Sequence, residues 1–521
     1  MVNKNQIILA LIVIFALLLR LPQIISDQIP FAFDMGRDMI WAQNLILFKD
    51  FFLIGPWTAL SGIFFGPFWW YLLSIGYIFT GGNPQTGALI DCSLNIIALI
   101  LAYFIGAKLK SKRLGLIIAF LIAISPLIVN ISTAAFNPYP LALTTLLLIW
   151  SLYQFSLKKY NYLILSSLLI GISFHWEPAT AIFLIPVLFV YVLLNLKVLQ
   201  KIKICLLSIF AFILPFIPQI IFELRHNFSQ TKAFIGFVDG SNKSLKGQMV
   251  LIPRISDRLA KYFDLYKSSV LSSNSNLLPA TLLVISAIIL YYIYIKSKNS
   301  FKKFILVNIL IIFIPLLAYI FLFKPELKTW YLCGFSIPII VLTAIVINWL
   351  WEKSRAIGFG LIIFFVLINV NFVSLKKALL NNAKPFTGPE ILSVQKEVID
   401  YIYNDAQGKS FSVYVYTPPI YDYHYQYLFW WYGKKQHNYW PEEYSYLPGK
   451  TDYMPSKEKY LEIQHQKQPQ KEPEFIYLII EPDKMQDRID GWKGHFASQK
   501  FIKSYNLNDI IIEKRVVSPS S

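Results

Sequence analysis

The sequence predicts a polytopic α-helical membrane protein with about eleven transmembrane helices and a C-terminal soluble α/β domain. Hydrophobic residues make up 56% of the 521 residues, and the mean hydropathy is +0.51. Apolar runs of roughly span length recur along the chain, and short lysine clusters separate them. The composition turns polar after about residue 376. These observations exclude a single soluble globular domain.

The first apolar run covers about residues 7–25. No small-residue cleavage site follows it, so we interpret it as a retained helix and not as a signal peptide. The other candidate spans match the length of about 20 apolar residues that a helix needs to cross a membrane. They are about 87–107, 114–131, 139–156, 161–175, 178–195, 203–222, 276–296, 304–323, 331–351 and 355–374.

One further apolar run, 62–80, decides the predicted topology. If it does not cross, every basic cluster between spans lies on the same side as Lys4; if it crosses, all of them lie outside. Cytoplasmic loops carry an excess of lysine and arginine, so we predict an interfacial or re-entrant helix at 62–80. The N-terminus is then cytoplasmic, and residues 27–86 and 223–275 form two long external loops.

The helical membrane part is predicted over residues 1–376, and residues 380–521 form an extracytoplasmic α/β domain. Its expected elements are a helix near 391–402, strands at 411–416, 475–480 and 510–517, and a helix at 485–496. Ten aromatic residues crowd the segment 421–440. They suit stacking on sugar rings, but a buried core is the favoured interpretation of any one of them.

The net charge of +18 does not indicate a nucleic-acid partner, because the lysines lie mostly in short clusters between apolar runs. The three cysteines form no CxxC and indicate neither a disulfide framework nor a zinc site. No cofactor is implied by a motif. A divalent metal is compatible with the acidic residues, but no ligand pattern indicates one.

The segment FDMGRD, near the outer end of the first span, contains the sharpest candidates for chemistry. Asp34 and Arg37 are three residues apart, so they share a face of a helix, and Asp38 follows directly. A carboxylate at the membrane surface can act as a general base on an acceptor hydroxyl or hold a cation. The alternative is a structural acid–arginine pair that fixes an interfacial helix.

Two further groups of ionisable residues end predicted spans on the external side. His175 and Glu177 lie in FHWEP and suit substrate binding or proton transfer; the alternative is a hydrogen-bonded pair at a helix end. Arg225 and His226 follow another span and are a candidate phosphate clamp, in addition to the external turn described below. For this pair a structural role is the stronger alternative.

The external turn KPELKTWYL contains Glu326, Lys328 and Tyr331. A fixed lysine and a tyrosine hydroxyl at the membrane surface suit a lipid-linked phosphate. The alternative is an ordinary lysine whose ammonium group reaches the interface, beside a belt of aromatic residues.

Four short motifs in order along the chain give a resemblance. They are FDMGRD, GIFFGPFWWYLL, the basic turn KLKSKRLG and a span that ends in ISP. Together they resemble the GT-C membrane glycosyltransferases, in particular the protein mannosyltransferase-like and aminoarabinose-transferase-like family, over roughly residues 5–375. The resemblance implies a polyprenyl-phosphate-linked sugar donor and direct displacement at the anomeric carbon, with inversion.

The resemblance also implies roles for single residues. Asp34 matches the catalytic base of the first loop, and Arg37 matches the arginine that follows it. Lys328 and Tyr331 are the counterparts of residues that hold the carrier phosphate. Many members have Asp-Glu where this chain has Asp34-Met35, and an aspartate where this chain has Asn137. These departures put an essential metal in doubt.

Two other classes of function fit the same composition. A lipid-linked glycan transporter would explain the many spans and the polar residues near them, but no inverted repeat is evident. A non-enzymatic glycan-binding membrane protein would use the aromatic residues of the outer domain. For the enzyme, the expected partners are membrane lipids, the polyprenyl-phosphate-linked donor and a glycan, lipid or protein acceptor in the cell envelope.

Overall fold

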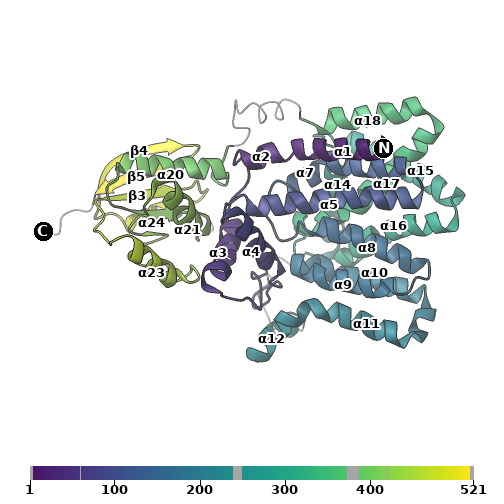
Figure 1. Ribbon diagram of the computed structural model, residues 1–521, viewed down its shortest axis with the longest axis horizontal. Coiled ribbons are helices and arrows are strands. Elements are labelled where there is room, and N and C mark those ends of the chain that lie inside the picture. Colours follow the sequence, from purple (N-terminus) through teal and green to yellow (C-terminus); the bar gives the residue numbers. More distant parts are fainter. Residues whose placement is uncertain (1–3, 59, 239–248, 372–386, 419–420, 517–521) are drawn as a thin grey trace.

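The computed structural model describes residues 4–58, 60–238, 249–371, 387–418 and 421–516. Apolar helices lie side by side in one bundle, and a sheet domain sits at one end of this bundle (Figure 1). The helices α3 (Phe33–Phe48) and α4 (Phe68–Thr80) lie between the two parts. The architecture is therefore of the predicted class.

Six helical stretches in the described residues are long and apolar enough to cross a membrane. They are α1–α2 (Lys4–Ile25), α5 (Thr86–Leu109), α11–η2–α12 (Ile202–Arg225), α15 (Leu277–Lys296), α16 (Asn299–Phe321) and η3–α17 (Thr329–Lys353). Shorter apolar helices are α4, α8 (Leu141–Ser156), α9 (Tyr162–Trp176), α10 (Pro178–Leu193) and α18 (Arg355–Asn369). How many of these helices cross the membrane stays a prediction.

Five further helices of the described residues complete this part of the chain. They are α6 (Lys112–Ile124), α7 (Pro126–Ile131), η1 (Leu196–Gln200), α13 (Ser229–Val238) and α14 (Leu251–Val270). The predicted span 114–131 is thus two helices, because the Ser125 side chain caps a new helix that begins at Pro126. The buried Arg20 side chain donates hydrogen bonds to the carbonyls of Ile122 and Ala123 at the end of α6.

The predicted interfacial helix at 62–80 is α4, which has 13 residues. At 1.5 Å per residue it is about 20 Å long, shorter than the roughly 30 Å hydrocarbon core of a bilayer. Its position at the end of the bundle, beside α3 and the sheet domain, agrees with a helix that does not cross (Figure 1).

The C-terminal domain has a five-stranded sheet in the order β2-β1-β3-β5-β4. The strands β2 and β3 flank β1 in parallel, and β5 runs antiparallel to β3 and β4. The strands are β1 (Phe411–Tyr416), β2 (Tyr444–Ser445), β3 (Phe475–Ile480), β4 (Lys500–Leu507) and β5 (Ile510–Val516). The three predicted strands are confirmed, whereas β2 and β4 were not predicted. The expected boundary at 376–380 lies outside the described residues.

Helices cover the sheet on both sides of the parallel strands (Figure 1). They are α20 (Leu392–Ala406), α21 (Tyr423–Leu428), η4 (Phe429–Gly433), α22 (Lys434–His437), α23 (Lys457–Lys467) and α24 (Gln486–Gly494). Tyr425, Tyr427 and Phe429 have no exposed surface, and Tyr423 is 3% exposed. These aromatic rings of the segment 421–440 therefore form core, as the favoured interpretation predicts, and are not a sugar-stacking surface.

Candidate active site

The helix α3 carries FDMGRD in its first two turns, directly after the extended residue Ala32. Asp34 lies in the first turn, where the partial positive charge of a helix N-terminus favours an acidic side chain. Arg37 and Asp38 follow three and four residues later, on the same face. The local sequence therefore brings one cation to two anions within a single helix.

The Arg37 guanidinium joins the two carboxylates. Its Nη1 lies 2.7 Å from Asp34 Oδ1, while Nε and Nη2 lie 2.9 and 2.8 Å from Asp38 Oδ1. Two indole N–H groups of α4 also donate to Asp38, from Trp69 at 3.0 Å and from Trp70 at 2.8 Å. Asp38 thus accepts four hydrogen bonds, which is the bonding of a buried structural carboxylate.

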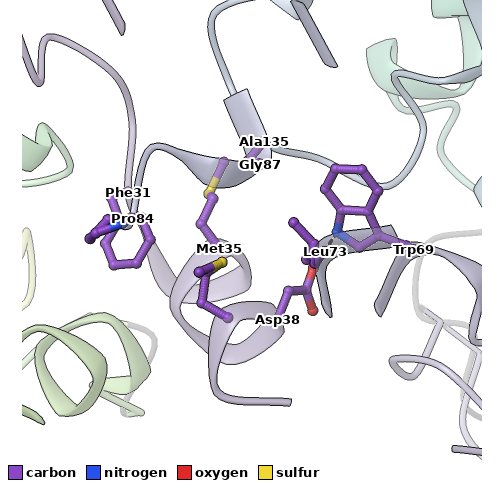
Figure 2. A pocket seen from close by; sticks show the side chains of 9 residues that line it. Phe31, Met35, Asp38, Trp69, Leu73, Pro84, Gly87 and Ala135 are labelled. Carbon is purple, nitrogen blue, oxygen red and sulfur yellow. Dashed lines mark hydrogen bonds between the residues drawn. The ribbon is translucent and has the colours of Figure 1, made fainter. Parts of the chain in front are cut away.

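The two carboxylates differ in their access to solvent. The Asp38 side chain is 2% exposed, whereas the Asp34 side chain is 42% exposed and, among the described residues, pairs with Arg37 alone. Figure 2 shows Asp38 beside Trp69 at the wall of a small pocket of about 10 Å³, which has room for about one water molecule. Of the two acids, only Asp34 is open to a substrate.

Burial and charge act against each other in this group. Burial raises the pKa of Asp38, and the Arg37 guanidinium acts in the opposite direction. Burial alone would lower the pKa of Arg37, but the charges of Asp38 and Asp34 outweigh it and raise that pKa. Four donors point at Asp38, which leaves no acceptor for a carboxyl proton, so we treat it as ionised. The three side chains then carry a formal charge of −1.

The C-terminal domain contacts α3 directly beside this group. A Cβ atom at Gly36 would lie 2.3 Å from the His424 backbone nitrogen, so only glycine lets α21 approach this closely. Phe33 packs edge-on against Tyr423 at 5.1 Å, and the Arg37 guanidinium lies 5.8 Å from the centre of the Phe33 ring. The first turn of α3 is therefore held from both the bundle and the sheet domain.

An open pocket of about 360 Å³ lies on the other side of Arg37. Its lining is mainly aromatic and comes from α3, α4, α12 (Ile217–Arg225) and the segment between α3 and α4. The lining residues are Arg37, Trp41, Phe51, Phe52, Leu53, Ile54, Gly55, Pro56, Trp57, Phe64, Trp70 and Phe222.

A short hairpin forms the outer wall of this aromatic pocket. Gly55 N and Phe65 O are 2.8 Å apart, and Trp57 pairs with Phe64 in an antiparallel bridge. The Gln230 side chain accepts a hydrogen bond from Phe64 N at 2.9 Å, which ties the hairpin to α13. The first and second predicted external loops therefore meet at this pocket.

His175 and Glu177 are buried and bonded to backbone groups. His175 Nε2 lies 2.8 Å from Pro215 O, and its ring stacks on Phe68 at 3.8 Å. Glu177 accepts a hydrogen bond from Ala179 N at 3.1 Å and caps α10. Both side chains thus bond to backbone groups, and no hydrogen bond between the two is seen among the described residues. Glu177 Oε2 is buried with no partner among these residues.

The turn with Glu326 and Lys328 is exposed and lies beside α14. Lys328 Nζ pairs with Glu326 at 2.5 Å and lowers its pKa. The Tyr331 carbonyl accepts a hydrogen bond from Thr180 at 2.5 Å, and its side chain is partly buried. The structure records no contact between this turn and the Asp34 group among the described residues.

Arg225 and His226 lie at the exposed end of α12. His226 stacks on Phe222, one of the pocket-lining residues, at 4.0 Å. Arg225 has no ion pair among the described residues, so its role as a phosphate clamp stays a prediction.

Two arginines of α14 were missed in the sequence analysis. Arg254 is 6% exposed, and its Nε and Nη1 atoms have no hydrogen-bond partner in the described part of the chain. Arg258 is fully buried and donates to the carbonyls of Phe323 and Pro325, which fixes the turn before Lys328. The spacing of four residues in RISDR on an amphipathic stretch is the signal that points to one helix face.

The part of the chain that the structure describes assembles no metal site. Asn137, where the resemblance implies an aspartate, donates from its amide nitrogen to the Trp176 carbonyl at 2.7 Å. In the described ranges, no three His, Cys, Asp or Glu side chains gather in a geometry that could hold a metal ion. We therefore derive no step through a metal.

Comparison with known proteins gives a family match over part of the chain and a shared fold over almost all of it. Residues 66–222 match the family model described as dolichyl-phosphate-mannose-protein mannosyltransferase. A search with the sequence among curated proteins gives no match.

Two solved structures share the fold over almost the whole length of both chains. ArnT from Cupriavidus metallidurans in the apo state has a TM-score of 0.56 at 11% identity and covers 98% of this chain and 98% of that chain. ArnT bound to undecaprenyl phosphate has a TM-score of 0.53 at 11% identity, with 99% and 98% covered. At this identity the likeness establishes the fold.

Proposed function

We propose that this chain is an inverting glycosyltransferase that acts at the outer face of the membrane and uses a polyprenyl-phosphate-linked sugar. The matched family model is named for a dolichyl-phosphate-linked donor, and one of the two ArnT structures holds undecaprenyl phosphate. The observation that carries the proposal is the contrast between the exposed carboxylate of Asp34 and the enclosed one of Asp38.

In the proposed reaction, Asp34 accepts the proton of an acceptor hydroxyl. The hydroxyl oxygen attacks the anomeric carbon of the donor, and the bond between that carbon and the phosphate oxygen breaks. Its electron pair leaves with the polyprenyl phosphate. One displacement inverts the anomeric centre. Arg37 positions Asp34 through the bond of 2.7 Å.

Negative charge grows on the leaving phosphate and must be offset. Lys328 at the external turn is half-open to solvent, and the buried Arg254 has two nitrogen atoms with no partner in the described residues. Both side chains belong to segments that pack together, since α14 contacts η3 (Thr329–Phe335). We assign the carrier phosphate to this side of the site, with Tyr331 as a further donor.

The outer-face assignment rests on the basic clusters, which lie on one side of the predicted topology. The sheet domain contacts the N-terminus of α3, so it belongs to the same side of the membrane as Asp34. The transporter and glycan-binding alternatives predict no sugar transfer by the purified chain.

The test is sugar transfer by the full chain reconstituted in vesicles with a polyprenyl-phosphate-linked sugar and an envelope glycan extract. Asp34→Asn should lower turnover by roughly 10²–10⁴-fold, the usual effect of losing positioned proton transfer. Asp50→Asn is the matched control, because Asp50 follows α3 and pairs with Lys459 at 3.0 Å. Full turnover of Asp34→Asn at equal abundance would contradict the role of Asp34.

A further inference from the structure

We infer that the aromatic pocket beside Arg37 binds an uncharged sugar ring of the acceptor, so that the acceptor is a glycan. This inference rests on the proposed function and names its acceptor class. The pocket lies next to the proposed base, since Arg37 is in its lining and also bonds Asp34 at 2.7 Å. An acceptor in this pocket would therefore place a hydroxyl close to Asp34, because only the Arg37 side chain lies between the pocket and the Asp34 carboxylate.

The rings of the pocket are arranged as a platform and a rim. Trp41 and Trp70 stack at 4.8 Å, and Phe52 meets the two indoles edge-on at 5.5 and 5.2 Å. At the rim, Trp57 is 52% exposed and Phe51 is 75% exposed. Large aromatic rings left exposed beside a pocket are typical of a binding site, because a ligand covers apolar surface there.

A sugar ring has apolar C–H faces and polar hydroxyl edges. The C–H faces match the flat indole rings, and the hydroxyl edges match the exposed Trp57 indole and the carboxylate of Asp34. The volume of about 360 Å³ falls within the usual range for small-molecule pockets.

The charge of the pocket wall excludes the donor phosphate from this place. Every guanidinium nitrogen of Arg37 is already bonded to Asp34 or Asp38. The three side chains carry a formal charge of −1, so they repel a phosphate and accept a neutral group. The carrier phosphate and the acceptor sugar are thus separated, with the phosphate on the side of Lys328 and Arg254.

The sheet domain does not supply this subsite. Its aromatic residues Tyr425 and Tyr427 are fully buried, so they cannot stack on a ligand. The exposed rings near Asp34 come instead from the segment between α3 and α4, which the hairpin holds against α13.

The first measurement is binding. Saturation-transfer difference NMR on the full chain in nanodiscs would use neutral methyl hexosides, with farnesyl phosphate and inorganic phosphate as competitors. We expect contacts from the hexoside C–H protons and no displacement by either phosphate. Trp57→Ala should weaken the signal at least five-fold, and Trp57→Phe should keep part of it because a ring remains. Phe501→Ala is the control, because Phe501 is 51% exposed on the remote strand β4.

The second measurement is kinetic. Trp57→Ala should raise the KM for the acceptor at least ten-fold and leave the donor KM unchanged. A raised donor KM, or displacement of the hexoside by farnesyl phosphate, would overturn the inference and assign the pocket to the carrier. Absence of hexoside binding would also overturn it. A third outcome separates the two proposals. If the wild-type chain binds the hexoside but transfers no sugar, and Trp57→Ala loses the binding, the subsite is supported and the proposed function is contradicted.

Discussion

Gly36 of α3 lies against the backbone of His424 in α21, at a separation that leaves no room for a Cβ atom. The closest atom to such a Cβ would be the His424 nitrogen at 2.3 Å, which is main chain and cannot rotate away. The position couples the sheet domain to the helix that carries Asp34. Its sequence neighbours Met35 and Arg37 face other parts of the structure, the small pocket and the aromatic pocket.

Gly36→Ala should therefore force α21 away from α3. We expect a loss of about 1–3 kcal/mol in the free energy of unfolding, the usual cost of an extra methyl group in a packed interface. Thermal unfolding and the protease sensitivity of the sheet domain would measure it in nanodiscs. Gly360→Ala is the control, because a Cβ atom at Gly360 in α18 meets nothing within 4 Å. Equal stability of the two variants would contradict the close packing.

Asp34→Asn and Asp38→Asn should separate chemistry from structure. Asp38 accepts four hydrogen bonds, so Asp38→Asn should destabilise the chain by about 1–3 kcal/mol, with the loss of transfer smaller than in Asp34→Asn. Asp34 is partly exposed, and losing its ion pair should cost about 0–1 kcal/mol. Unfolding temperature and turnover, measured on the same preparations, test this. If Asp38→Asn lost more turnover and Asp34→Asn lost more stability, Asp38 would be the base and Asp34 the structural acid.

Lys328→Ala should raise the KM for the lipid-linked donor, because a charge-assisted contact to phosphate is lost. Losing such a contact costs about 1.5–3 kcal/mol, which corresponds to a rise in the donor KM of roughly 10–100-fold. Arg254→Lys keeps the charge but loses the planar fork, and should raise the donor KM by a smaller factor. Lys459→Ala, at an exposed pair with Asp50, is the control. An unchanged donor KM in Lys328→Ala would return Lys328 to the role of an interfacial lysine.

Lys457 should make the stability of the sheet domain depend on pH. Burial lowers its pKa from 10.5 to about 7, against the opposing charges of Asp422 and Glu443. Between pH 7 and 10.5 the unfolded state therefore holds a proton that the folded state lacks. The free energy of unfolding should rise with pH across this window, by up to about 1.4 kcal/mol per pH unit. Below the window Lys457 is charged in both states, so the full cost of burying its charge destabilises the fold.

Thermal unfolding of the full chain at several pH values checks this prediction. Lys457→Met should remove the difference between the acidic and basic ends of the window, because the variant has no group to titrate. Lys459→Met is the control, since Lys459 is 47% exposed. A wild-type slope that persists in Lys457→Met would assign the pH dependence to another group.

The predicted topology can be tested with single cysteines. Lys112→Cys at the first residue of α6 should be protected from a membrane-impermeant reagent in intact cells, and Gln470→Cys in the sheet domain should react. Cys205, which is half-buried, is replaced by alanine; Cys92 and Cys333 are buried. Labelling of Lys112→Cys from outside would contradict the predicted topology, and the inverted orientation would place Asp34 on the cytoplasmic side.

The sequence determined the class of the protein through local patterns. Apolar runs of span length and lysine clusters report a bilayer directly, because each span is a continuous stretch of chain. FDMGRD brings Arg37 to Asp34 in the same way, since residues three apart meet on a helix, and it places Asp38 directly after Arg37. The three predicted strands follow from apolar stretches such as FIYLII in β3. The strand β2 escaped prediction because it has two residues, and β4 because half of its sequence KFIKSYNL is polar.

The tertiary structure decided which acid is open. Trp69 and Trp70 arrive from another helix to enclose Asp38, and no spacing along α3 distinguishes it from Asp34. The aromatic pocket likewise needs α3, α4, α12 and a hairpin to converge. Burial of Arg254 on α14, and of Tyr425 and Tyr427 in the sheet domain, depends on neighbours far along the chain. Exposure is a property of such long-range packing, whereas charge and helical spacing are fixed by the chain itself.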